Sequence, residues 1–449
     1  MVCSLVFIMS SCHLYQKYEL PKDTPIVSDY AAAQEMQVDS SQLGYQNWRD
    51  IFNDPFLRNY IRTALENNKD LNTARLNVEI AQAQLLGAKL SYFPSVAFSP
   101  NGGTASYGGS HMNWSYTLPL SVSWEIDAFA KILNRKRGAK VNVEMAEDYV
   151  DAVRSQIIAA VANTYYNIVA LNLQLDLSNK TAAIWNEQVE TMMLMKESSR
   201  VNEAAVVQTR ANYYAILASI PDIELAIKQM QNVLSLLLNE YPKTWDFTHD
   251  MEFTAPEFAT SGVPMYYLAT RPDVHAAERN FAAAYYATQS AKAAFYPSIV
   301  ISAQGGFTNL LGSIVMNPGE WFIQLAGSIT APIFSRGQNI ATLKASKAQQ
   351  QQALLNFQYT VLNASSEVSN ALVSYTTSNE KQGYLDKQII ELEKSVSYTQ
   401  ELLTLGKATY LEVLTAQQGL LSAQLSSINS WHTKVAAIIN LYQALGGGR

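Results

Sequence analysis

The chain has 449 residues, a formal net charge of −6 and only 16% charged residues. A modest acidic charge without a basic run disfavours nucleic acid as a partner. The sequence contains no run of about 18 apolar residues, so we expect no transmembrane helix, and integration into a membrane would require a closed β-barrel.

Residues 1–11 are predicted to be a signal peptide. Val2 to Met9 is mostly apolar, and two serines then precede Cys12, as in a bacterial lipoprotein signal. We therefore expect cleavage before Cys12 and acylation of this residue. The pattern departs from that signal in two ways, because Met9 replaces the usual leucine and no basic residue precedes the apolar run. A plain signal peptide is the alternative, and either way Cys3 is removed, which leaves no cysteine pair for a disulfide.

Residues 12–50 are predicted to form an extended N-terminal arm, because they are polar and weakly periodic. A helix containing Leu57 and Ile61 should follow, and then a second helix from Asp70 to about Leu90. The second helix should end before Pro94, because the residue before a proline avoids the helical conformation.

Residues 114–126, W-S-Y-T-L-P-L-S-V-S-W-E-I, alternate strictly between apolar and polar side chains. Trp114, Tyr116 and Trp124 lie near the two ends of the apolar face, a pattern typical of a strand between lipid and water with aromatic girdles. Thirteen residues extend about 43 Å, which is enough to cross a hydrocarbon layer about 30 Å thick. The edge of a soluble antiparallel sheet alternates in the same way. A strand over 94–98 and a turn over 101–113 would complete a hairpin over residues 94–126.

Two long helices are predicted to follow this hairpin. The first, over residues 131–198, has apolar side chains at steps of three and four and would be about 100 Å long. A return helix from Glu203 to Asn239 should be interrupted at Pro221. Residues 241–264 read as irregular.

The same order of elements then occurs again. Identical residues recur 203 positions apart; among them are Leu65 and Leu268, Asp70 and Asp273, Ala74 and Ala277, Lys89 and Lys292, Pro94 and Pro297, and Ser95 and Ser298. A second hairpin is predicted over 297–333, with strands 297–307 and 321–333, and Trp321 begins its second strand. A long helix over 337–405 and a return helix follow. The chain is therefore predicted to contain two repeats, residues 51–240 and 271–449, joined by an irregular equatorial segment, residues 241–270.

Four membrane-length strands cannot close a barrel, and unpaired strand edges are not tolerated in lipid. The chain should therefore oligomerise, with eight strands from two copies or twelve from three. Taken alone, the helices would also fit a coiled coil or a periplasmic helical hairpin.

Several short segments together carry a family resemblance. They are W-R-D-I-F-N-D-P-F-L at 48–57, S-V-S-W-E-I-D at 121–127, R-P-D-V at 271–274, A-F-Y-P-S at 294–298, A-P-I-F at 331–334 and A-L-G-G-G at 444–448. In this order, and within this duplication, the set resembles the outer-membrane efflux channels of the TolC/OprM type, lipoprotein branch. The resemblance covers nearly the whole chain from Cys12 onward.

This resemblance implies a mostly α-helical fold with a membrane β-barrel. Three chains would form a trimeric α-helical barrel in the periplasm and a 12-stranded β-barrel, four strands per chain, in the outer membrane. The homotrimer would be lipid-anchored and would serve as the exit duct of a tripartite efflux system. Its implied partners are a periplasmic adaptor protein, an inner-membrane transporter of the RND type and outer-membrane lipid.

The resemblance also assigns roles to residues at the tips of the helix hairpins. Ser199 and Arg200 at the first tip, and Gly406 and Lys407 at the second, would dock the adaptor. Glu412 lies where relatives form an acidic constriction ring that holds cations and disfavours anions, and Thr415 stands where some relatives have a second acid.

Purely structural roles are alternatives for Glu412 and Gly406, and a structural role is predicted for one further motif. Glu412 is also favourable in the first turn of a helix, and Gly406 as a helix terminator. Arg271-Pro272-Asp273 is predicted to start a helix and to pin the junction between helix wall and barrel.

An enzyme is not expected. The five histidines share no metal-ligand spacing, and the chain has no phosphate-binding glycine loop and no nucleophile elbow, so we predict no catalytic residue, cofactor or metal. Two alternative functions are a helical-hairpin binding protein of the envelope that forms no pore, and the outer-membrane component of a type I protein secretion system. The sequence does not identify the exported substrate.

Overall fold

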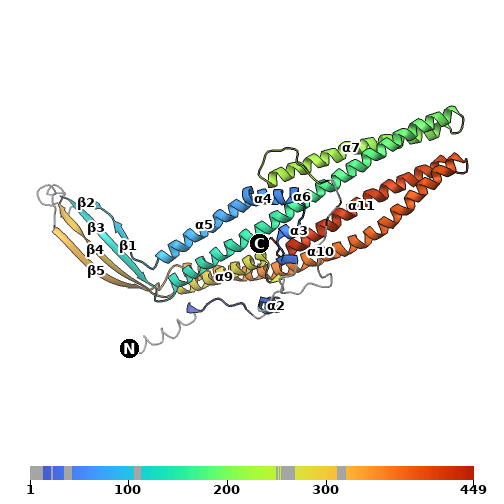
Figure 1. Ribbon diagram of the computed structural model, residues 1–449. Helices are drawn as coiled ribbons and strands as arrows, with labels where there is room; N and C mark the ends of the chain where they lie inside the picture. Colours follow the sequence, from blue (N-terminus) through green and yellow to red (C-terminus); the bar gives the residue numbers. More distant parts are fainter. Residues whose placement is uncertain are drawn as a thin grey trace. The chain divides into compact units, whose positions relative to one another are not determined.

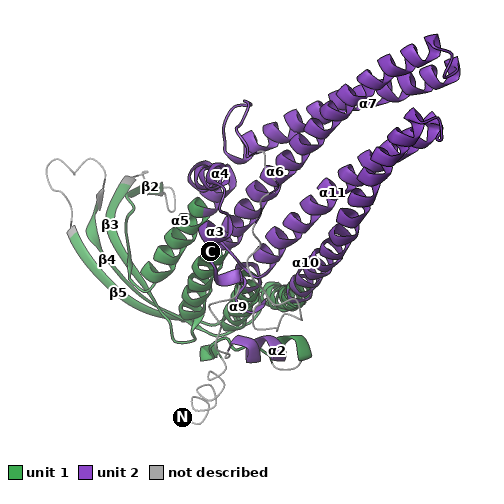
Figure 2. Ribbon diagram, turned by 45° about the vertical axis from the view of Figure 1, so that its right-hand side comes forward, with its two compact units in different colours: residues 1–27, 75–148, 275–360 green, residues 28–74, 149–274, 361–449 purple. Residues whose placement is uncertain are grey.

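Figure 1 shows the computed structural model of the chain, which describes residues 14–21, 24–34, 43–105, 113–248, 251, 253, 268–310 and 320–448. The predicted signal peptide and Cys12 lie outside these residues. The chain divides into two compact units (Figure 2). Unit 1 comprises residues 1–27, 75–148 and 275–360, and unit 2 comprises residues 28–74, 149–274 and 361–449, so each unit contains segments of both predicted repeats.

The elements follow one another in the predicted order, helices first and then a hairpin in each half. The first half contains α2 (Pro25–Gln34), η2 (Leu43–Tyr45), α3 (Trp48–Ile51), α4 (Pro55–Asn67), α5 (Lys69–Leu90), β1 (Ser95–Phe98), β2 (Asn101–Ala105), β3 (Asn113–Ile126), α6 (Lys131–Glu197) and α7 (Glu203–Leu237). The second half contains α9 (Pro272–Ala293), β4 (Ser298–Leu310), β5 (Glu320–Thr330), α10 (Gln338–Thr404) and α11 (Tyr410–Ala444).

The lengths of the helices reveal the duplication. Helices α5 and α9 have 22 residues each, α6 and α10 have 67 each, and α7 and α11 have 35 each. The helices before the hairpins start 203 positions apart, at Lys69 and Pro272, and those after the hairpins start 207 positions apart, at Lys131 and Gln338. Four additional residues of the second half therefore lie between the end of α9 and the start of α10.

The strands form one antiparallel sheet in the order β1-β3-β4-β5, with β2 also pairing with β3 (Figure 1). Strands β1 and β2 share one register on β3, because Phe98 lies opposite Leu120 and Asn101 lies opposite Thr117. They are thus one strand interrupted at Ser99-Pro100. Pro119 faces this interruption from β3, and neither proline can donate a backbone hydrogen bond.

The predicted turn over 101–113 is wrong in its first part, since β2 continues the strand to Ala105. Gly102 and Gly103 suggested a turn, but glycine also occurs in strands where backbones approach closely. A Cβ added to Gly102 would lie 3.2 Å from the Ser115 carbonyl oxygen. At the other edge of the sheet, β5 ends at Thr330 rather than at residue 333, because its partner β4 begins only at Ser298.

Two helix predictions are also corrected. The arm over residues 12–50 is not wholly extended, because Pro25 occupies the first position of α2 and three alanines continue this helix. Helix α7 is not interrupted at Pro221 but continues to Leu237. Pro221 removes one backbone donor at an exposed position, and the helix has buried residues on both sides of it, such as Val206 and Leu234. Among the described residues, no helix has the length and apolar character needed to span a membrane.

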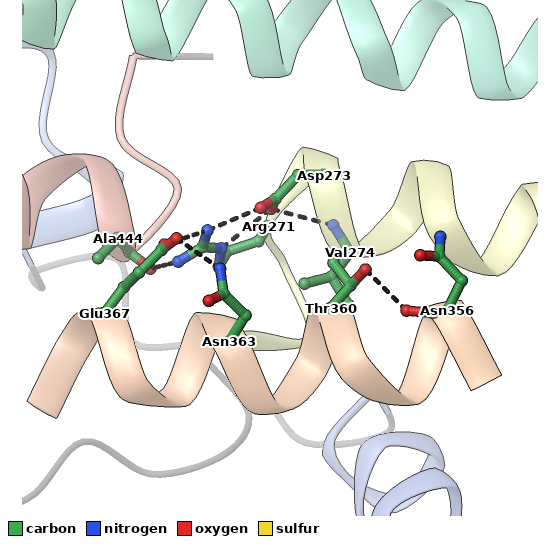
Figure 3. A network of polar contacts seen from close by, with 8 residues as sticks. All are labelled: Arg271, Asp273, Val274, Asn356, Thr360, Asn363, Glu367 and Ala444. Atoms are coloured by element: carbon green, nitrogen blue, oxygen red, sulfur yellow. Dashed lines mark hydrogen bonds and ion pairs between the residues drawn. The ribbon is translucent and has the colours of Figure 1, made fainter. Parts of the chain in front are cut away.

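Arg271 ties three helices together in unit 2 (Figure 3). Its side chain is 7% exposed, and it donates to both carboxylate oxygens of Asp273 at 2.9 and 2.7 Å. It also donates to Glu367 on α10 at 2.7 Å and to the Ala444 carbonyl at the end of α11 at 2.9 Å. Burial alone would lower the pKa of Arg271, but the two carboxylates outweigh burial and raise it. The predicted helix start at Arg271-Pro272-Asp273 is confirmed.

The first repeat makes an equivalent contact through an uncharged side chain. Asn68, 203 positions before Arg271, donates to the Leu237 carbonyl at the end of α7 at 2.9 Å. Leu237 in turn lies 207 positions before Ala444. The duplicated position therefore has one task in both repeats, which is to bind the end of the return helix.

The backbone of β4 at Gly306 lies close to the backbone of β3, and substitutions here can test this contact. A Cβ added to Gly306 would lie 2.1 Å from the Leu118 carbonyl oxygen, whereas a Cβ on Gly327 meets nothing within 4 Å. We expect Gly306→Ala to destabilise the folded sheet by about 1–3 kcal/mol and Gly327→Ala to change stability by less than about 0.5 kcal/mol. Urea titration followed by tryptophan fluorescence measures both; equal midpoints would contradict the close β3–β4 contact.

Arg271→Met should lower stability by about 2–3 kcal/mol, because it removes charged hydrogen bonds made by a buried donor. Arg279→Met is the matched control. Arg279 also lies on α9, but it is 37% exposed and its ion-pair distances are 3.7 and 3.9 Å, so its loss should cost less than about 1 kcal/mol. Thermal unfolding followed by circular dichroism compares the two, and an equal loss of stability in both variants would refute the role given to Arg271.

Candidate functional site

The sheet presents one continuous apolar face across all of its strands. Pairing places Leu120 of β3 opposite Phe98 of β1 and Gly305 of β4, and Gly305 in turn opposite Ile323 of β5. The exposed apolar side chains of this face are Val96, Phe98, Leu120, Trp124, Ile126, Ile301, Phe307, Trp321, Ile323, Leu325 and Ile329. Side chains of this kind on a broad outer face are suited to lipid rather than to water.

The opposite face is lined by hydroxyl and amide groups. Gln304 of β4 donates through Nε2 to the Ser121 hydroxyl at 3.0 Å, and Gln304 pairs in register with Gln324 of β5. Thr117 and Thr308 are hydrogen-bonded across β3 and β4 at 3.3 Å. Glu125, at the end of β3, forms an ion pair with Lys131 at 2.8 Å. This face is therefore suited to water.

The aromatic residues predicted to form the girdle differ in how exposed their side chains are. Trp124 is 42% exposed and Trp321 is 72% exposed, both on the apolar face. Trp124 also donates through Nε1 to the Tyr92 carbonyl at 2.9 Å, which fixes its ring at the end of the strand. Tyr116 is buried, and the side chain of Trp114 lies outside the described residues.

Both helix-hairpin tips of unit 2 are built in the same way. Ser199 and Gly406 each have a positive φ, 57° and 70°, immediately after a long helix. The following residues, Arg200 and Lys407, donate backbone hydrogen bonds to Met195 and Leu402 at 2.8 and 2.9 Å. This arrangement is a Schellman cap, in which glycine is favoured, so Ser199 occupies a glycine-type position. All four predicted docking residues are exposed.

The acidic groups at the two tips have different partners. At the first tip, Glu203 forms an ion pair with Lys196, which lowers the pKa of Glu203. At the second tip, the exposed Glu412 accepts a hydrogen bond from the backbone N–H of Thr409 at 3.2 Å. Glu412 therefore helps to cap α11, as its position in the first turn suggested. Thr415 donates its hydroxyl to the Leu411 carbonyl at 2.8 Å.

Tyr410, which no sequence pattern singled out, joins the two hairpins. Tyr410 opens α11 and is buried in a cluster with Trp185 and Met192 of α6 and Val206 of α7. Burial raises the pKa of its hydroxyl. An aromatic residue just after a Gly-Lys-Ala-Thr turn was the only available indication, because its partners lie more than 200 positions away in the sequence.

Comparison with known proteins identifies the kind of protein that has this architecture. The family model described as outer membrane efflux protein matches residues 60–240 and 264–447. The cation efflux system protein CusC of Escherichia coli O6:H1 is 27% identical over 98% of this chain and 96% of its own length. The toluene efflux pump outer membrane protein TtgC of Pseudomonas putida is 28% identical over 98% and 94%. The crystal structure of the open state of the Neisseria gonorrhoeae MtrE outer membrane channel superposes with a TM-score of 0.84 at 26% identity, over 96% of this chain and 98% of that chain.

The matched segments contain both hairpins, both pairs of long helices and both tips. The chain therefore belongs to the outer membrane efflux protein family and acts as an exit duct in the outer membrane.

Proposed function

We propose that this exit duct is a homotrimer in which each chain contributes its four strands to a twelve-stranded barrel and its long helices to an α-helical barrel in the periplasm. The observation that carries the proposal is the sheet, which has a continuous apolar face and a hydroxyl- and amide-lined face. Each of its two edges pairs on one side only within the described sheet. Twelve strands leave an interior wide enough for water, whereas eight are just filled by side chains.

The duct works without catalysis and receives its substrate from other proteins. A periplasmic adaptor would dock at the two exposed tips, Ser199-Arg200 and Gly406-Lys407, and an inner-membrane transporter of the RND type would supply the energy. The equal construction of the tips supports one mode of docking at both. The family match argues against a hairpin protein without a pore and does not favour a role in type I secretion.

The choice between classes of exported cargo is proposed to lie outside the duct, whose charged constriction would affect only how readily small ions pass. Relatives of nearly equal identity are named for the efflux of cations and of toluene, which differ completely in charge and polarity. A conduit whose relatives serve such different cargo is best explained if the inner-membrane transporter makes the choice.

We place the narrowest point at Glu412. Three carboxylates around one axis would attract cations, so the assembled channel in planar bilayers should be cation-selective. Glu412→Gln removes the charge but keeps an acceptor for the Thr409 N–H, and it should therefore move the reversal potential in a KCl gradient toward zero without loss of stability. Glu412→Ala should move it equally and should also lower the thermal midpoint.

The matched control is Glu401→Gln, which removes an exposed charge from α10 beside the same tip. We expect its reversal potential to equal that of the unchanged channel. If Glu412→Gln behaves like this control while Glu412→Ala loses stability, Glu412 is a helix cap and not a gate. Absence of conductance from the purified, folded protein would reject the duct itself.

Lipid attachment at Cys12 is proposed on the sequence pattern that precedes it. The unchanged protein should incorporate radioactive palmitate in growing cells, and Cys12→Ser should abolish incorporation, because Cys3 leaves with the signal peptide. Cys3→Ser is the control and should leave labelling unchanged. Labelling that persists in Cys12→Ser would show that the lipid is attached elsewhere.

A further inference from the structure

A groove of about 450 Å³ lies between helices α5, α6 and α9 of unit 1. This volume is within the range of small-molecule sites. Much of the wall of the groove is made of the smallest residues, namely Gly87, Ala88, Gly138, Ala139, Ala283 and Ala287. Small side chains leave the volume open, but they do not by themselves indicate a ligand.

A buried side-chain oxygen at the wall of this groove indicates what a ligand would have to supply. Asn134 of α6 is 0% exposed and lines the groove. Its Nδ2 donates to the Leu14 carbonyl of the N-terminal arm at 2.9 Å, which fixes the orientation of the amide and leaves Oδ1 on the side of the groove. Within the described part of the chain, Oδ1 has no hydrogen-bond partner. A buried acceptor without a partner is costly, so a hydrogen-bond donor from outside the chain is favoured here.

The groove opens on the same side as the polar face of the sheet. One side of α6 carries four residues at steps of four and three, which are Lys131, Arg135, Gly138 and Asn142. Lys131 forms the ion pair with Glu125 on the polar face, and the other three line the groove. The N-terminal arm lies on a different side of α6, where Arg137 donates to two arm carbonyls at 2.9 and 3.3 Å. The groove is therefore part of the wall that is suited to water.

The remaining side chains narrow the class of ligand. Tyr286 of α9 is buried at the wall of the groove, and its hydroxyl accepts a hydrogen bond from the Tyr18 N–H at 3.2 Å. Its aromatic side chain suits a second ring. Arg135 is exposed and brings a positive charge, which disfavours a cationic ligand. These features suit an uncharged or anionic aromatic molecule that carries a hydroxyl group.

We propose that this groove binds an aromatic hydroxyl compound. The hydroxyl group donates to Oδ1 of Asn134, and the ring lies on the glycine and alanine wall beside Tyr286. All of the binding residues come from one chain. The site rests on the proposed duct in one respect, because the polar face must line the lumen for the ligand to be exported cargo. It then retains one class of molecule at the wall, and the choice of cargo stays with the transporter.

Binding of 1-naphthol to the purified protein in lipid nanodiscs tests the site. The matched ligand is 1-methoxynaphthalene, which has the same rings but no hydrogen-bond donor. Equilibrium dialysis should give saturable binding of one naphthol per chain, at least about fivefold tighter than binding of the methoxy compound, because only naphthol satisfies the buried acceptor. Empty nanodiscs measure the partition of both compounds into lipid, which does not saturate.

Two substitutions connect the binding to the groove. A Cβ on Gly87 meets nothing within 4 Å, so Gly87→Leu fits without a clash, fills the groove and should abolish saturable binding. The matched control is Gly383→Leu on α10 in unit 2, where a Cβ also meets nothing within 4 Å, and it should leave binding unchanged. Asn134→Leu should reduce the ratio of the two affinities to about one. If Asn134→Leu does not fold, Gly87→Leu decides alone.

Equal affinities of the unchanged protein for the two compounds, absence of saturable binding, or binding that survives Gly87→Leu would overturn the site. Conductance of the same protein in planar bilayers separates this failure from failure of the duct. A conducting channel that binds no naphthol would reject only the groove. A protein that binds naphthol as expected but does not conduct would reject only the duct.

Discussion

Unsatisfied backbone groups at the edges of the sheet constrain the whole molecule. Strand β5 and the interrupted strand formed by β1 and β2 each pair on one side only within the described sheet. An unpaired N–H or C=O group costs several kcal/mol in hydrocarbon, so a sheet with one lipid-suited face cannot remain open in a membrane. Other copies must supply the missing pairs. The assembly of several copies follows from this requirement.

The duplication explains how one chain can supply both edges. Positions that correspond between the two repeats keep the same backbone contact but carry side chains of different charge and polarity. Asn68 and Arg271 bind the ends of α7 and α11 at the same 2.9 Å, and only Arg271 also binds two carboxylates. Arg279 faces acids inside the chain, whereas its counterpart Leu76 is exposed. The two hairpin tips likewise share a cap but differ in the partners of Glu203 and Glu412.

Much of this architecture could be predicted from sequence because it depends on periodicity. Alternation over residues 114–126 and long runs without proline define strands and helices locally, and the 203-residue offset defines the repeat. The errors arose where a local preference was outweighed. Gly102 and Gly103 suggested a turn but lie in β2, and Pro221 suggested a helix end but lies inside α7. Pairing with β3 decided the first case, whereas α7 continues through an exposed Pro221 with buried residues on both sides of it.

The functional residues were less predictable than the fold. Glu412 could be located at a tip, but its hydrogen bond to Thr409 depends on the cap geometry. Tyr410 could not be identified, because its burial depends on Trp185 and Val206 in the other repeat. Contacts of this kind have no local pattern in the sequence.

The number of chains in the assembly tests the central claim most directly. Native mass spectrometry of the protein released from a mild detergent measures that number without reference to conductance. The account predicts a single species of three chains, each close to the 49.8 kDa of the full sequence less its signal peptide. A stable monomer, or a dimer whose eight strands would close without a water-filled interior, would contradict it.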